Sequence, residues 1–149
     1  MLNSYAITAK FLTELFEANP LVNTVIFGAD MDINKTNIFP LVHIFPGEMS
    51  MADNRLEMTF EIAVVNQRQT PNHSQTDKIF GNNLIDNLNL TSAILTQEIT
   101  KIEMQYNDFD ITIASSTPAQ PIIYADKNVL DGFECTLVLS IQNIIETCQ

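Results

Sequence analysis

The chain has 149 residues, of which 18 are acidic and 7 are basic, so its formal net charge at pH 7 is −11. Hydrophobic residues make up 46% of this length and charged residues 17%, which favours a folded protein with a single domain, residues 1–149. The negative charge excludes a basic surface for gripping nucleic acid or anionic lipid.

The first predicted element is a helix that begins near Asn3 or Ser4 and ends before Asn19-Pro20. A short polar side chain at the start accepts hydrogen bonds from the free amides of the first turn, and the proline stops the helix. A short apolar strand is expected at residues 22–27. The apolar stripe of the helix has helical spacing and consists of Tyr5, Ala9, Leu12 and Phe16, widened by Phe11 and Leu15.

The next strand, predicted at residues 36–45, is apolar on both faces. Such a strand is either central in a sheet or covered by a partner on one face, and the sequence leaves both alternatives open. One face carries Ile38, Val42 and Ile44, and the other carries Phe39, Leu41, His43 and Phe45.

A strand at residues 55–65 follows and alternates between apolar and polar side chains. Pro46-Gly47 and Ala52-Asp53-Asn54 bracket the segment before it, which predicts an extended hairpin loop. The residues expected to point inward are Leu56, Met58, Phe60, Ile62 and Val64.

A long helical stretch and three further strands are predicted in the second half. The helix is capped by Ser74 or Thr76, weakens at residues 89–91 and ends near Met104. Brief strands are expected at 109–113 and 122–125, with a loop at 115–121 between them. The last strand points Phe133, Cys135, Leu137, Leu139 and Ile141 inward. This order of elements predicts an α+β fold, with an N-terminal and a central helix packed on an antiparallel sheet.

No residue pattern matches a catalytic or metal site. Asp30-x-Asp32-x-Asn34 begins like a calcium loop, but Lys35 stands where the sharp turn needs glycine. Cys135 beside His43 across the sheet would pair a nucleophile with a base, although a buried free thiol is the commoner role of a strand cysteine. We therefore expect no catalysis, no metal and no cofactor.

The strand at 36–45 is also the best candidate for a surface that is buried only on assembly. An exposed apolar strip with a charged rim is typical of a subunit interface. The rim would include Glu57 and Glu61. The candidate interface residues are Phe39, Leu41, Phe45, Arg55 and Arg68.

The cellular compartment follows from the N-terminus and the cysteines. Residues 1–10 lack the basic start and apolar run of a signal peptide, and no stretch approaches the roughly 20 apolar residues of a membrane span. Cys135 and Cys148 do not make a disulfide framework. We expect synthesis in the cytoplasm and no membrane partner.

The last third of the chain resembles the C-terminal strand pair of small structural proteins from tailed phages. In residues 120–143, a strand and a polar turn precede a Leu-x-Gly-aromatic step into an alternating strand. The order of helix, strand trio and central helix is also similar to that of tail-terminator and neck (head–tail joining) proteins. The residues that carry the resemblance are Leu130, Gly132, Phe133, Asn143 and Cys148.

This resemblance implies a structural virion protein made in the host bacterial cytoplasm. Tail terminators form rings, commonly hexameric, that cap the tail tube and dock to the head connector. A ring needs a closing contact between copies, and the candidates for it are the strand at 36–45 and the loop at 46–54. The implied partners are other copies, the tail tube protein and connector or neck proteins. DNA passes through without specific binding, which agrees with the acidic charge. The alternatives are a small α+β module that binds a ligand or peptide, and another tail component such as a tube, completion or baseplate protein.

Overall fold

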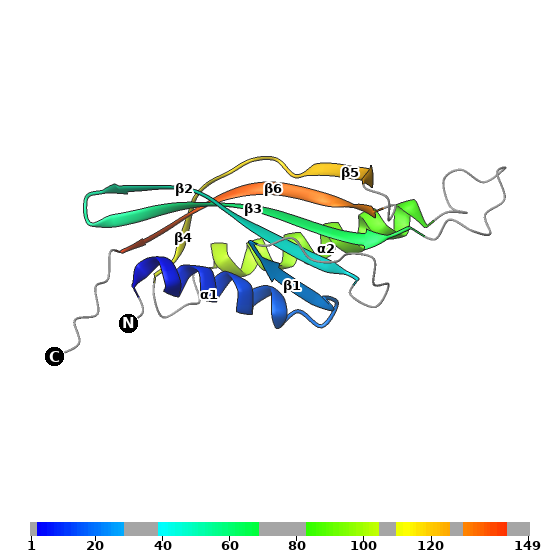
Figure 1. Ribbon diagram of the computed structural model, residues 1–149, viewed down its shortest axis with the longest axis horizontal. Coiled ribbons are helices and arrows are strands. Elements are labelled where there is room, and N and C mark those ends of the chain that lie inside the picture. The colour runs from blue at the N-terminus through cyan, green and yellow to red at the C-terminus, as the bar shows by residue number, and fades with distance from the viewer. Residues whose placement is uncertain (1–2, 29–38, 69–82, 105–109, 126–129, 143–149) are drawn as a thin grey trace.

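Two helices lie on one face of a six-stranded mixed sheet (Figure 1). The structure, a computed structural model, describes residues 3–28, 39–68, 83–104, 110–125 and 130–142. The helices are α1 (Ser4–Glu17) and α2 (Leu84–Glu103). The α+β class, with an N-terminal and a central helix packed on the sheet, is confirmed. Neither helix within the described ranges is long and apolar enough to cross a membrane.

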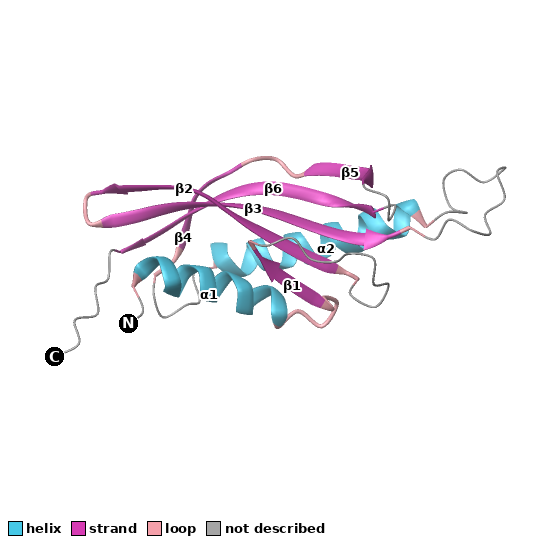
Figure 2. Cartoon of the chain, viewed as in Figure 1, coloured by secondary structure: helices cyan, strands magenta, loops and turns pink. Residues whose placement is uncertain are grey.

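The sheet has the strand order β1-β2-β3-β6-β4, and β5 pairs with β6 on the same edge as β4 (Figure 2). The β1–β2 pair is parallel and the other pairs are antiparallel, so the sheet is mixed rather than antiparallel throughout. The strands are β1 (Thr24–Phe27), β2 (Leu41–Ala52), β3 (Arg55–Gln67), β4 (Thr112–Ser116), β5 (Gln120–Ala125) and β6 (Leu130–Gln142).

Helix α1 begins and ends where the sequence predicts. The Oδ1 atom of Asn3 accepts a hydrogen bond from the backbone amide of Ala6 at 3.1 Å and so caps the first turn. After the helix, Asn19 connects α1 to α2, because its Nδ2 donates to Oε1 of the fully buried Glu98 at 2.9 Å. Lys101 donates to the same oxygen at 3.0 Å, so the buried carboxylate has a cation beside it.

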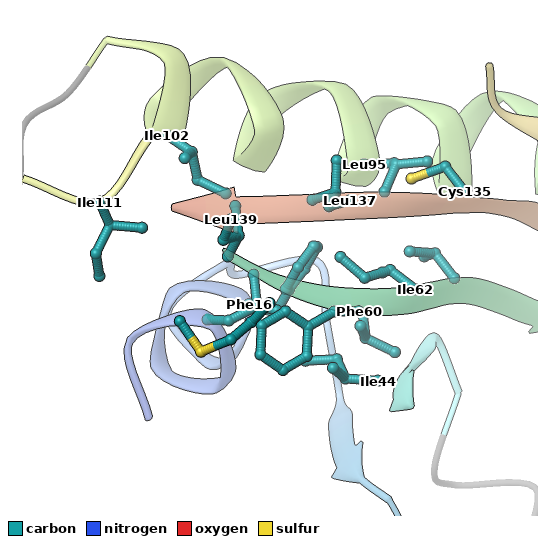
Figure 3. Packing of buried hydrophobic residues seen from close by; sticks show 14 of the residues in the cluster. Phe16, Ile44, Phe60, Ile62, Leu95, Ile102, Ile111, Cys135, Leu137 and Leu139 are labelled. Atoms are coloured by element: carbon teal, nitrogen blue, oxygen red, sulfur yellow. The ribbon is translucent and has the colours of Figure 1, made fainter. Parts of the chain in front are cut away.

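The main hydrophobic core lies between the helices and the sheet. All the inward residues predicted for β3 are buried, as are Cys135, Leu137, Leu139 and Ile141 of β6, while Phe133 is partly buried. Figure 3 shows Leu95 and Ile102 of α2 directed toward β6, and Phe16 of α1 beside Phe60 of β3. The alternation in the sequence therefore identified the helix-covered face of both strands.

The connection between β2 and β3 differs from the predicted extended loop. β2 continues to Ala52, and the turn consists only of Asp53 and Asn54, with φ values of 53° and 63°. Positive φ at both central residues is what a type I′ hairpin turn requires, and Asp and Asn tolerate it. At its other end β2 begins at Leu41, and residues 36–38 of the predicted strand lie outside the described residues.

Helix α2 also differs from its prediction. It runs without a break from Leu84, although a weakening was predicted at residues 89–91. Thr91 lies within that stretch, but it is buried and its hydroxyl donates to the carbonyl of Asn87 at 2.7 Å, so the helical turn is kept. Asn83 occupies the position before the helix, whereas the predicted caps Ser74 and Thr76 lie outside the described residues.

Candidate interaction surfaces

The described residues offer no metal site. No group of three or more His, Cys, Asp or Glu side chains in this part of the chain is placed to hold a metal ion, and the calcium-like segment at 30–34 lies outside it. Cys135 pairs with Ile62 in the helix-covered core, whereas His43 pairs with Ala63 on the opposite face. The idea of a Cys135–His43 pair is therefore wrong.

Cys135 is instead the buried free thiol that the sequence favoured. Its side chain belongs to the main core, and burial raises the pKa of the thiol above its ordinary value of 9.0. A raised thiol pKa disfavours the thiolate, which is the nucleophilic form. Cys135 therefore contributes packing rather than reactivity.

Two predicted interface residues, Phe39 and Leu41, are buried within the chain, with exposed fractions of 6% and 2%. They belong to a second, smaller cluster on the sheet face that the helices leave uncovered. β2 is apolar on both faces here because β1 and β3 flank it and each face has its own apolar cluster. The interface prediction is wrong at these two positions. The other buried members of the smaller cluster are Ile26, Val65 and Leu130.

Arg68 does not lie at a surface rim either, because it is 7% exposed. Its Nε and Nη2 atoms donate to the two carboxylate oxygens of Asp131, each at 2.7 Å, and Asn87 of α2 donates to Oδ2 of that carboxylate at 3.4 Å. Removal of one partner from such a pair costs about 3–5 kcal/mol, because the remaining charge is buried without compensation. Arg68 thus joins the end of β3 to β6, and the rim prediction is wrong for it.

Phe45 and Arg55 remain accessible. Phe45 is 36% exposed, and its ring centroid lies 3.8 Å from that of His43. Arg55 Nε donates to the hydroxyl of Ser140 at 2.8 Å, and its Nη1 lies 3.9 Å from a carboxylate oxygen of Asp110. Exposed ion pairs of this kind contribute little to stability. An interface at these two residues stays a prediction.

Beyond Phe45, the β2–β3 hairpin extends past the N-terminal end of α1 (Figure 2). We call residues 46–54 the arm, and all of them are exposed. β1 pairs only with residues 41–44 of β2, so the outer edge of β2 from Phe45 to Ala52 has no strand neighbour among the described residues. The arm therefore presents open backbone hydrogen-bonding groups.

Two methionines make the arm apolar, with Met49 49% exposed and Met51 72% exposed. A β-bulge directs them to the helix side of the sheet: Pro46 pairs with Phe60, but Met49 pairs with Met58, so β2 has one extra residue. Without the bulge, both methionines would lie on the uncovered face. The sequence predicts residues 46–54 as a loop and as a candidate ring contact, but it misses that they continue β2 as a strand. The signal was Pro46-Gly47, since a proline inside a strand marks an edge or a bulge.

The uncovered face of the sheet carries a groove of about 280 Å³ beside Phe45. Strands β2, β3 and β6 and the connection between β4 and β5 all contribute to it. Its lining includes Phe45, Glu61, Ala63, Gln120, Glu134 and Thr136.

The arm and the groove are thus two different surfaces: the arm is the outer part of β2 with its turn, and the groove extends from Phe45 across β3 to β6. No protein-family model matches the chain, and a search of curated proteins finds no match. The functional conclusion consequently rests on these two surfaces and on the resemblance carried by residues 120–143.

Proposed function

We propose that this protein is a structural component of a tailed-phage virion, made in the host bacterial cytoplasm. It acts as a tail terminator that assembles into a ring, caps the tail tube and docks to the connector or neck proteins of the head. This role depends on contacts between proteins and needs neither catalysis nor a cofactor. The observation that carries the proposal is the exposed, apolar arm with its open strand edge.

The arm has the properties of a docking element. A strand from another protein can pair with its open edge, while the methionine side chains leave water. Natural proteins protect exposed edges with charges and prolines. Pro46 and Glu48 protect the inner part of the arm in this way, but residues 49–52, Met-Ser-Met-Ala, have neither, and this favours an outer part that is covered after assembly.

A ring requires that each copy use two different surfaces. A projecting arm that docks on another part of the next copy makes such a heterologous contact, and the contact closes into a ring when the rotation between copies allows it. The net charge of −11 suits a ring through which DNA passes without binding. The resemblance at Leu130, Gly132 and Phe133 adds the phage context.

Two alternatives lead to different assemblies. A tube, completion or baseplate protein would use the same arm, but a tube subunit would polymerise without a fixed end. A small ligand-binding module would work as a monomer through the groove. The groove, at about 280 Å³, lies near the lower end of the roughly 300–1,000 Å³ typical of small-molecule sites, so the oligomeric state is what separates the two functions.

Replacement of both arm methionines tests the proposal. We expect Met49→Glu with Met51→Glu to abolish self-association, because the carboxylates would be desolvated in the contact. Both residues are exposed, so the fold should survive. The measurement is sedimentation velocity at matched concentrations, with circular dichroism to check folding.

Met104→Glu is the matched control, since Met104 is 57% exposed but lies at the end of α2. This variant should associate like the wild type. If the folded double variant also associates like the wild type, the arm is not the interface and the proposal loses its support.

A further inference from the structure

The groove owes its shape to two neighbouring rows of side chains that cross the uncovered face. Small residues, Ala63 and Thr136, lie between larger ones and leave a hollow. The β4–β5 connection forms the far side, where the amide of Thr117 donates to the carbonyl of Thr136 at 2.9 Å. The first row consists of Phe45, Glu61 and Thr136, and the second of His43, Ala63 and Glu134.

Two glutamates, Glu61 and Glu134, line this hollow, and both side chains are exposed. Glu61 pairs with Thr136 and Glu134 pairs with Ala63, which makes the two glutamates diagonal neighbours, about 7–8 Å apart at their Cα atoms. None of the ion pairs among the described residues includes either carboxylate. The negative charge of the two glutamates is therefore not neutralised by any of the described ion pairs.

The aromatic ring of Phe45 lines the groove alongside the carboxylates. The ring also contacts that of His43, with the centroids 3.8 Å apart and an interplanar angle of 34°. A cation against an aromatic face gains attraction from the ring quadrupole. The volume of about 280 Å³ is large enough for one long side chain.

We infer that this groove receives an arginine side chain from a different protein. A planar guanidinium has five N–H donors, so it can bridge two carboxylates and lie against a ring at the same time. Metal binding is not favoured, because the described residues offer no third acidic, His or Cys ligand at this place.

The charges of the chain favour an occupant other than a second copy. The sequence contains two arginines: Arg68 is buried against Asp131, and Arg55, although accessible, contacts Ser140 and Asp110. Another copy would also bring a net charge of −11 to a negative groove. The inference is thus independent of self-assembly through the arm, which lies beyond Phe45 in the hairpin.

The binding of a labelled peptide tests the inference. The probe is the fluorescein-labelled pentapeptide Gly-Val-Arg-Val-Gly, and the readout is fluorescence anisotropy at physiological salt. We expect saturable binding that weakens by about tenfold or more when citrulline, a neutral isostere, replaces arginine. Equal binding of the two peptides, or no saturable binding of the arginine peptide, would overturn the inference.

Matched charge variants locate the binding. The double variant Glu61→Gln with Glu134→Gln should weaken the binding of the arginine peptide by about tenfold or more. Glu57→Gln with Glu103→Gln removes the same charge from exposed residues outside the groove lining and should leave binding nearly unchanged. If both double variants bind the peptide equally weakly, binding depends only on the total charge of the protein, and the groove is not the site.

Discussion

Phe39 and Phe45 both lie on the uncovered side of the sheet, but in different surroundings. Phe39 is packed in the smaller cluster with Leu41 and Val65 and is 6% exposed. Phe45 borders the groove and is 36% exposed. The same side chain is therefore core in one position and accessible surface in the other.

Truncation of each phenylalanine should reveal this difference. We expect Phe39→Ala to lower the free energy of unfolding by about 3–5 kcal/mol, since it removes a buried ring and leaves a cavity. Phe45→Ala should cost about 1 kcal/mol or less, as is usual for accessible positions. Urea denaturation of the two variants measures both values. Similar losses for the two would contradict the assignment of Phe39 to the core.

Single residues also show which features can be predicted from the sequence and which cannot. Alternation identified Met58, Phe60 and Ile62 as inward because a strand has two faces and one of them must be buried. It could not identify the Arg68–Asp131 pair, because the two residues are distant in sequence and a buried ion pair leaves no periodic pattern. Arg68, a charged residue after a strand, is therefore predicted from the sequence to lie on the rim of the interface.

At the scale of elements, Gly132 sets how closely β3 and β6 approach each other. A Cβ atom at this position would lie 1.8 Å from the carbonyl oxygen of Val64. The backbone at Val64 cannot move away without disturbing the long β3–β6 pairing. The glycine in the Leu-x-Gly-aromatic step thus has a structural reason of its own.

Gly132→Ala should consequently be strongly destabilising. Overpacking in a well-packed site typically costs about 1–3 kcal/mol, and we expect a loss at or above the upper end of that range. Gly47→Ala is the control, because its Cβ would lie 3.2 Å from Thr59, a milder contact. Thermal unfolding of both variants gives the comparison, and an unchanged midpoint for Gly132→Ala would show that β3 and β6 separate easily.

The elements themselves were predictable to different degrees. The ends of α1 followed from local signals, a cap at Asn3 and a stop at Asn19-Pro20. The length of β2 did not, because Asp53-Asn54 is a weaker turn signal than Asn-Gly and the bulge after Pro46 reverses the alternation. For that reason the sequence predicts a loop, rather than a strand, at residues 46–54.

At the scale of the whole molecule, the two faces of the sheet have different tasks. The helix-covered face holds the main core and gives the fold its stability. The uncovered face carries the groove, and the hairpin extends the sheet beyond the helices as the arm (Figure 1). The sequence places a candidate ring contact at residues 46–54, but the side of the sheet on which the methionines lie, and the groove, depend on strand register and could not be predicted from it.

The central claim is that copies of this chain assemble through the arm into a closed ring. Native mass spectrometry of the wild-type protein across a wide concentration range tests it most directly. We predict one closed species with a fixed number of copies, whose mass does not grow once it has formed. A strict monomer at every concentration would contradict assembly, and a series of ever larger species would contradict closure.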